Sequence, residues 1–216
     1  MKQHLFIAGA NGGIGRQAVE QALQTGHKVT ALVRDPAKLP LAHPNLQIVT
    51  GDVLRPETFA HHIENAHAVI SALGVSGGLF SNKPTSLYSQ GSANLIAAME
   101  KYGVKRAFFI SASALEISPV LPWYARFAAK YVIQKLLKHM YADLRDMEAI
   151  VKASKTNWTI IRPPQLTDGP LIRNYRVAVN QFLKNALKIS RADVAHFILD
   201  NVDNQATQQA TVEIAY

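Results

Sequence analysis

Short apolar stretches alternate with amphipathic segments along most of the chain. The apolar stretches predict strands, and the segments whose apolar residues recur every three or four positions predict helices. This alternation is typical of a parallel sheet with helices on both faces. We expect strands at residues 4–8, 28–33, 46–50, 66–72, 104–111, 158–162, 173–179 and 211–215. We expect helices at residues 12–25, 55–63, 84–102 and 191–201, and two more within residues 119–153.

The ends of several elements carry recognisable signals. Gly103 is placed to end a helix in a left-handed conformation, and Pro163-Pro164 stops a late strand. Ser190 is placed to cap the last helix, with Asp193 as the acid of its first turn. No repeat, low-complexity stretch or linker interrupts the pattern. We therefore expect one α/β domain, residues 1–216, with a doubly wound, mostly parallel sheet and a small C-terminal region on the substrate side.

Composition excludes several classes of site. The 216 residues contain no cysteine, which excludes a disulfide framework, a thiolate metal site and a cysteine nucleophile. The eight histidines show no metal-ligand spacing, so no metal is expected. The net charge of +8 comes from scattered Lys and Arg, which disfavours a nucleic-acid surface. No signal peptide or membrane span is recognisable. We expect a cytoplasmic monomer or small homo-oligomer that acts on a small molecule.

The strongest motif is a glycine-rich loop between the first strand and the first helix. It comprises Gly9, Ala10, Asn11, Gly12, Gly13, Ile14 and Gly15. Gly9 permits a sharp turn, Gly12 lets the backbone approach a pyrophosphate, and Gly15 lets the helix pack closely on the sheet. The N–H groups and dipole of a helix start favour an anion there. The loop predicts a dinucleotide site, and a tight turn without a ligand is the alternative.

The end of the second strand bears on the choice of dinucleotide. An acid at that place binds the 2′-hydroxyl of NAD, whereas Arg accommodates the 2′-phosphate of NADP. Arg34 comes first after the strand, and Asp35 is better interpreted as a turn residue before Pro36. We therefore expect NADP(H). The alternative for Arg34 is a solvated surface charge.

These motifs together resemble the atypical short-chain dehydrogenase/reductase superfamily, on the NmrA-like side that includes biliverdin-IXβ/flavin reductases. The resemblance covers nearly the whole chain and implies a Rossmann fold that binds NAD(P). It also implies cofactor contacts after three further strands, at Asp52 and Val53, at Ser71, Ala72, Leu73 and Gly74, and at Ser111 and Pro163. Residues 189–195 match a C-terminal segment common in the superfamily, which we interpret as structural.

The catalytic centre departs from the superfamily pattern. Typical members carry Ser, Tyr and Lys, with Tyr-x-x-x-Lys on one helix face. Ser111 matches the serine, but Met140 and Leu144 stand where the tyrosine and lysine are expected. Tyr141 and Arg145 have the right mutual spacing but lie about 100° around the helix. Ser111 is therefore the candidate catalytic residue, as a hydrogen-bond donor to the nicotinamide or acceptor, or else a contact to the cofactor alone.

Aromatic residues after the fifth strand have two interpretations. Residues 122–127, with Phe80 and Tyr88 opposite, are candidates to line an acceptor pocket. Trp123, Phe127 and Tyr131 also recur at helical spacing, which favours a packing role.

Two functions fit these observations. The first is an NADPH-dependent reductase of a small, flat acceptor such as a flavin or quinone, because such reduction needs chiefly an open nicotinamide face. The second is a non-catalytic NADP(H) sensor that regulates a partner. Epimerase or dehydratase chemistry is disfavoured, since it normally requires the Tyr/Lys pair.

Overall fold

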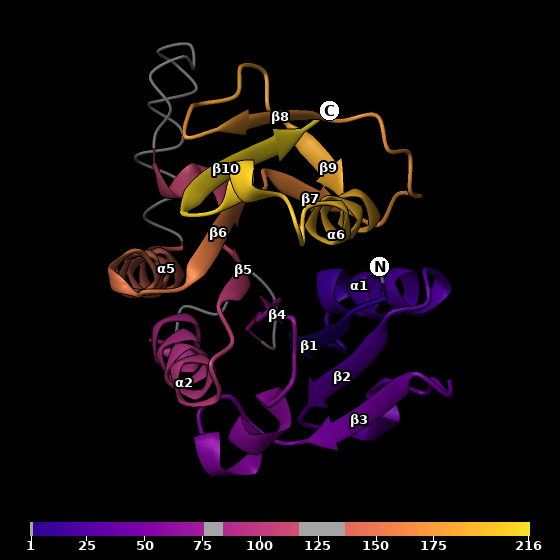
Figure 1. Cartoon of the computed structure of the whole chain (residues 1–216). Coiled ribbons are helices and arrows are strands. Elements are labelled where there is room, and N and C mark those ends of the chain that lie inside the picture. Colours follow the sequence, from indigo (N-terminus) through magenta and orange to yellow (C-terminus); the bar gives the residue numbers. More distant parts are fainter. Residues whose placement is uncertain (1, 76–83, 117–136) are drawn as a thin grey trace.

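The computed structural model describes residues 2–75, 84–116 and 137–216, which form one α/β domain around an eight-stranded sheet (Figure 1). The strands of this sheet are β1 (His4–Ala8), β2 (Lys28–Val33), β3 (Leu46–Thr50), β4 (Ala68–Ser71), β5 (Arg106–Ile110), β6 (Asn157–Arg162), β8 (Arg176–Val179) and β10 (Ala210–Ala215). The α-helices of the described residues are α1 (Gly13–Gln24), α2 (Leu87–Tyr102), α5 (Lys138–Ala153) and α6 (Arg191–Asp200). None of them is long and apolar enough to cross a membrane.

The sheet has the strand order β3-β2-β1-β4-β5-β6-β10-β8. Every neighbouring pair is parallel except β10 and β8, which run antiparallel at one edge. The chain winds outward from β1 to β3 and then returns to the other side of β1 with β4. This reversal defines a doubly wound sheet and confirms the predicted fold.

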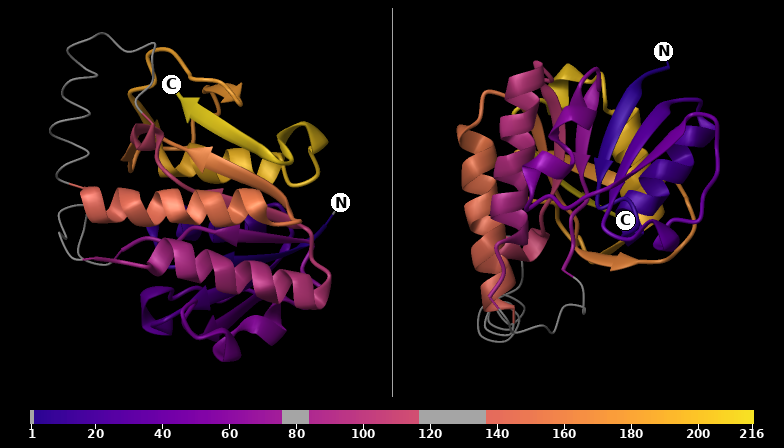
Figure 2. Two further views of the ribbon diagram at one scale, coloured as in Figure 1. Left: turned by 90° about the vertical axis from the view of Figure 1, so that its left-hand side faces the viewer. Right: turned by 90° about the horizontal axis from the view of Figure 1, so that it is seen from below.

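Helices cover both faces of the sheet. α1 and α6 lie together on one face, and α2 and α5 lie together on the other (Figure 2). Successive side chains of a strand point to opposite faces, so β1 contributes to both cores. Leu5 and Ile7 join the core beneath α1 and α6, whereas Phe6 and Ala8 join the core beneath α2 and α5. Strands buried on both faces explain the unbroken apolar stretches of the sequence.

The segment expected as a short helix at residues 55–63 is instead two 3-10 turns, Pro56–Thr58 and Ala60–Ile63. Phe59 separates the turns with φ −140°, and its ring is fully buried. The Thr58 hydroxyl donates to the Arg55 carbonyl oxygen at 2.7 Å and accepts from the Asp52 N–H at 3.0 Å. These local bonds tighten the first turn, so the helix prediction was wrong here.

Two short strands of the C-terminal region were not predicted from the sequence. β7 (Gln165–Thr167) and β9 (Lys188–Ser190) form a separate parallel pair. Three residues are too few to show a period of two, which is why neither strand was predicted. β9 leads directly into α6, and Ser190 caps that helix by accepting the Asp193 N–H at 3.0 Å, as expected. Gly103 likewise ends α2 in the left-handed region, with φ 72°.

The start of α2 is capped by a side chain from α5. Its N-cap residue, Ser86, makes no side-chain capping bond within the described part of the chain. The Asp143 carboxylate instead accepts the N–H of Tyr88 at 2.9 Å and that of Ser89 at 3.0 Å. Asp143 is only 3% exposed, so this negative charge lies buried at the positive end of the helix dipole. The contact joins α2 to α5.

Replacing this cap should destabilise the protein measurably. We expect Asp143→Ala to lower the free energy of unfolding by about 1–2 kcal/mol, because two N–H groups of the first turn of α2 lose their acceptor. Urea denaturation measures the change. The matched control is Asp146→Ala, an exposed residue on the same helix, which should alter stability by less than about 0.5 kcal/mol. Equal effects of the two substitutions would show that the Asp143 cap contributes nothing.

Candidate dinucleotide site

The glycine loop lies where the sheet reverses direction, between the carboxyl ends of β1 and β4. Gly9 has φ 76°, and a Cβ atom on it would lie 2.4 Å from the Ala72 carbonyl oxygen. A Cβ atom on Gly15 would lie 2.2 Å from the Gly9 carbonyl oxygen. Both positions therefore require glycine, for the reasons that the sequence analysis gave. Ligands of open α/β sheets bind in the crevice at such a reversal.

The start of α1 suits an anion. Gly12 and Gly13 are exposed there, and the first turn of the helix contains no acidic side chain. The first N–H groups of an α-helix lack intrahelical acceptors and carry the positive end of its dipole. A pyrophosphate is a group of the charge and size that these groups bind. The residues present thus fit the diphosphate of a dinucleotide.

Arg191, which lies in the C-terminal segment that we interpreted as structural, contacts this loop. A Cβ atom on Gly13 would lie 2.3 Å from Cδ and 2.5 Å from Nε of Arg191. Arg191 is the first residue of α6, and its Nη1 atom forms an ion pair with Asp168 Oδ1 at 2.7 Å. Only the packing of α6 beside α1 brings residues so distant in sequence together. No local motif could have indicated this contact.

The two residues after β2, Arg34 and Asp35, differ in their surroundings. Arg34 is exposed directly after the strand. The Asp35 carboxylate accepts the Ala37 N–H at 3.1 Å and so caps a short 3-10 turn. This bond confirms Asp35 as a turn residue. Asp35 is thus already engaged in local structure, while Arg34 stands at the place where an adenosine ribose meets β2 in this fold.

The predicted residues after β3 and β4 border the same crevice to different degrees. Asp52 accepts the Leu54 N–H at 3.0 Å, and Val53 is 6% exposed beneath α2. Ser71 and Ala72 are buried, whereas Leu73 is half-buried and Gly74 is exposed. A cofactor in the crevice would therefore reach Val53 and Ser71 mainly through backbone atoms.

Ser111 and Pro163 meet at the carboxyl ends of β5 and β6. The Ser111 N–H donates to the Ile161 carbonyl oxygen at 2.8 Å, and the Ser113 N–H donates to that of Pro163 at 3.0 Å. The Ser111 hydroxyl donates to Glu148 Oε1 at 2.7 Å. Its proton is thus directed at a carboxylate within the protein, an arrangement that the sequence alone did not indicate.

Glu148 belongs to a partly buried ionic cluster on the α5 side of the sheet. Arg162 binds its two carboxylate oxygens through Nε at 2.8 Å and Nη2 at 2.6 Å. Lys152 Nζ lies 3.1 Å from Oε2, and Glu116 lies 2.8 Å from Arg162 Nη2. Both Glu148 and Arg162 have side chains about 5% exposed or less. The cluster therefore satisfies its own charges beside Ser111.

These contacts determine the protonation states. Burial by itself opposes the charged form of Glu148, but the hydrogen bonds from Arg162 and Ser111 outweigh it and hold the pKa of Glu148 below its usual range. Burial likewise opposes the charge on Arg162, and the bonds to Glu148 and Glu116 outweigh it and raise the pKa of Arg162. Glu148 is therefore a carboxylate at neutral pH and cannot donate a proton.

Met140 and Leu144, where the resemblance leads us to expect the tyrosine and lysine, lie in apolar surroundings. Leu144 belongs to the core beneath α2 and α5, and Met140 packs against that core. Tyr141 is 4% exposed in the same core, and burial raises the pKa of its hydroxyl. Arg145 is exposed, with Nη2 at 3.5 Å from the Leu115 carbonyl oxygen. Tyr141 and Arg145 thus point to different environments and do not form a reactive pair.

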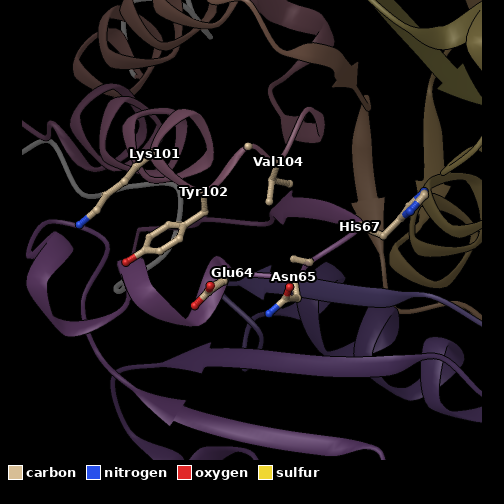
Figure 3. Close-up of a pocket in the computed structure, with 8 residues that line it drawn as sticks. Glu64, Asn65, His67, Lys101, Tyr102 and Val104 are labelled. Carbon is tan, nitrogen blue, oxygen red and sulfur yellow. The ribbon is translucent and has the colours of Figure 1, made fainter.

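A cavity of about 570 Å³ opens at the other end of the strands (Figure 3). It is lined by Glu64, Asn65, Ala66, His67, Lys101, Tyr102, Gly103 and Val104, which precede β4 and β5. These residues lie at the amino ends of the strands, away from the glycine loop. The cavity is therefore separate from the dinucleotide site.

Part of the predicted acceptor pocket lies outside the described residues. Phe80 and residues 122–127 belong to the segments that the structure does not describe, as does Tyr131. Tyr88 is described, is 8% exposed, and belongs to the core beneath α2 and α5.

Comparison with known proteins finds a nucleotide-binding family model, a bacterial relative of similar length and solved structures with the same fold. A family model described as NAD(P)H-binding matches residues 9–205. The uncharacterized sugar epimerase YhfK of Bacillus subtilis is 30% identical over 97% of this chain and 92% of its own length. A short-chain dehydrogenase/reductase from Veillonella parvula, solved in complex with NADP, superposes with TM-score 0.82 at 18% identity, covering 100% of this chain and 95% of that one. ChuY, an anaerobillin reductase from Escherichia coli, superposes with TM-score 0.75 at 23% identity, covering 98% and 96%.

The ionic cluster should make stability depend on pH. A carboxylate whose pKa is lowered by folding contributes stability that is fully present above its unfolded value, 4.5 for Glu148, and is lost as pH falls through the folded value. We expect Glu148→Gln to cost about 3 kcal/mol at neutral pH, because Arg162 loses its buried counter-ion, and to flatten the loss of stability on acidification. Urea midpoints from about pH 7 to about pH 3 measure both effects.

The control is Glu100→Gln, at an exposed position near the end of α2, which should keep the pH dependence of the wild type. If Glu148→Gln and Glu100→Gln gave the same pH profile, the charge of Glu148 would not stabilise the fold.

Proposed function

Because the chain belongs to the NAD(P)H-binding family, we propose that it is an NADPH-dependent reductase of a small, flat acceptor such as a flavin or quinone. The observation that carries the proposal is the combination of a glycine loop fit for a dinucleotide with a Ser111 hydroxyl that donates to Glu148. The first feature supports cofactor binding. The second supports a reaction in which the protein does not itself protonate the acceptor.

The residues of the crevice have distinct tasks under this proposal. The start of α1 holds the diphosphate at Gly12 and Gly13, and Arg34 binds the 2′-phosphate through its paired N–H groups. Pro163 and the end of β5 border the nicotinamide. The bound nicotinamide supplies a hydride when an acceptor lies against its open face. The protein's contribution is to orient the two rings.

The proton of the reaction comes from solvent under this proposal. Ser111 directs its hydroxyl proton to Glu148 and leaves only oxygen lone pairs for a ligand. Met140 and Leu144 have no exchangeable side-chain proton, and Arg162 is fixed by two carboxylates. A carbonyl reduction requires a donor to the nascent alkoxide, whereas a reduced flavin or quinone can take its protons from water. Ser111 is accordingly a positioning residue for the nicotinamide or acceptor.

The comparison proteins support this proposal in part. ChuY carries the name of an anaerobillin reductase and shares this fold, which supports reductase chemistry. YhfK carries the name of a sugar epimerase, which would require a side chain that removes and returns a proton. The carboxylate of Glu148 is already bound by Arg162, Lys152 and Ser111, so it is poorly placed for that task.

A reductase assay tests the proposal directly. Purified protein, NADPH and a panel of flavins and quinones should show NADPH consumption, measured by the loss of its absorbance, with at least one acceptor. A parallel panel of sugar nucleotides tests epimerase chemistry. Tight NADPH binding without turnover on either panel would favour the second candidate, an NADP(H) sensor, and would refute the reductase proposal.

Arg34 should determine the choice of cofactor. We expect Arg34→Ala to reduce the preference for NADPH over NADH by about tenfold or more, because the 2′-phosphate loses a charge-assisted pair of hydrogen bonds. Fluorescence titration with both dinucleotides measures the ratio. Lys101→Ala removes an equal charge at the opposite end of the strands and should leave the ratio unchanged. An unchanged ratio in Arg34→Ala would overturn the assignment of NADP(H).

A further inference from the structure

Arg191 crosses the exposed face of the glycine loop. Its Cδ and Nε atoms lie only 2.3 Å and 2.5 Å from the place that a Cβ atom on Gly13 would occupy. Gly13 is exposed, so the contact is not made to fill a core. The absence of a side chain at Gly13 is therefore what allows a guanidinium group to lie beside the first turn of α1.

Contacts on both sides of Arg191 hold its backbone in place. Gln21 of α1 donates to the Ala192 carbonyl oxygen at 2.9 Å in a buried hydrogen bond. Ser190 is fully buried and caps α6 by accepting the Asp193 N–H. Burial opposes the charge of Asp193, but hydrogen bonds led by that from Tyr216 outweigh it and lower the pKa of Asp193. The base of the Arg191 side chain is thus fixed next to the loop.

The guanidinium group of Arg191 has a partner that it can readily exchange. Its ion pair with Asp168 joins a side chain that is 29% exposed to one that is 90% exposed. Ion pairs in contact with water contribute little to stability. A diphosphate offers several anionic oxygens, and a guanidinium group binds such oxygens in pairs.

We propose that Arg191 is a cofactor-binding residue that leaves Asp168 and binds the diphosphate of the dinucleotide against the Gly13 face of the loop. This inference rests on the proposed use of a nicotinamide dinucleotide. The site then has two cations with different tasks. Arg34 binds the 2′-phosphate and thereby determines the preference for NADPH over NADH. Arg191 binds the diphosphate, which both cofactors have, and therefore contributes equally to the affinity for each.

The proposal predicts a specific pattern of affinities. Arg191→Ala should weaken NADPH and NADH by the same factor, about tenfold or more, because each loses a charge-assisted hydrogen bond to its diphosphate. The ratio of the two affinities should not change. Adenosine 2′-monophosphate, which has no diphosphate, should bind wild type and Arg191→Ala equally. Isothermal titration with the three ligands measures these affinities.

Further variants test the two partners of the ion pair. Arg191→Lys keeps the charge but not the paired donors, and should bind the dinucleotides with intermediate affinity. Asp168→Asn removes the competing anion and should bind NADPH at least as tightly as wild type. Lys101→Ala is the control for loss of a positive charge and should match wild type. Thermal melting of each variant confirms that the fold is intact.

The outcomes separate this inference from the proposed function. Wild-type protein that binds neither dinucleotide would refute both. Wild-type binding together with equal binding by Arg191→Ala would refute only the role of Arg191. A change in the NADPH:NADH ratio, or weaker binding of adenosine 2′-monophosphate, would also overturn it, because Arg191 would then act on the adenosine half.

Discussion

The close approach of the glycine loop to the end of β4 is the constraint on which the rest of the site depends. The Gly9 carbonyl oxygen fits against Gly15, and Gly9 itself fits against the Ala72 carbonyl oxygen, with no room for a Cβ atom at either glycine. This packing lets α1 start directly beyond β1, with its N–H groups facing the crevice. α6 packs against α1, and this packing brings Arg191 to the loop.

The crevice has two halves of different character. The half near α1 presents backbone N–H groups, the exposed Arg34 and the half-buried Arg191, which suit an anionic ligand. The half near α5 contains the buried Glu148–Arg162 pair, to which the more exposed side chains of Lys152 and Glu116 add one ion pair each. Its charges are used to hold Ser111, Glu148 and Arg162 in place and are not available to an acceptor.

The sequence predicted the fold well because the fold depends on local patterns. Apolar stretches located the eight strands of the sheet to within a few residues, and the glycine spacing located the crevice. The prediction was wrong at residues 55–63, where Thr58 and Phe59 favour tight turns over a helix. The short strands β7 and β9 carry no periodic signal at all.

The site was less predictable than the fold, because its side chains meet across long distances in sequence. The Ser111–Glu148 bond depends on how α5 lies on the sheet, and the Arg191–Gly13 contact depends on how α6 lies beside α1. Taken alone, Glu148 and Arg191 are ordinary polar residues of a helix, and nothing in the sequence near them indicates these contacts.

The ionic cluster also limits how a Tyr/Lys pair could be introduced at positions 140 and 144 of α5. Leu144 lies one helical turn before Glu148, so a lysine introduced there would face that carboxylate and pair with it. The introduced lysine would then form an ion pair with Glu148. A tyrosine at position 140 would therefore lack the cation that lowers its pKa. A Tyr/Lys pair and the Glu148–Arg162 cluster therefore compete for the same face of α5. Introducing the pair would also require replacing Glu148.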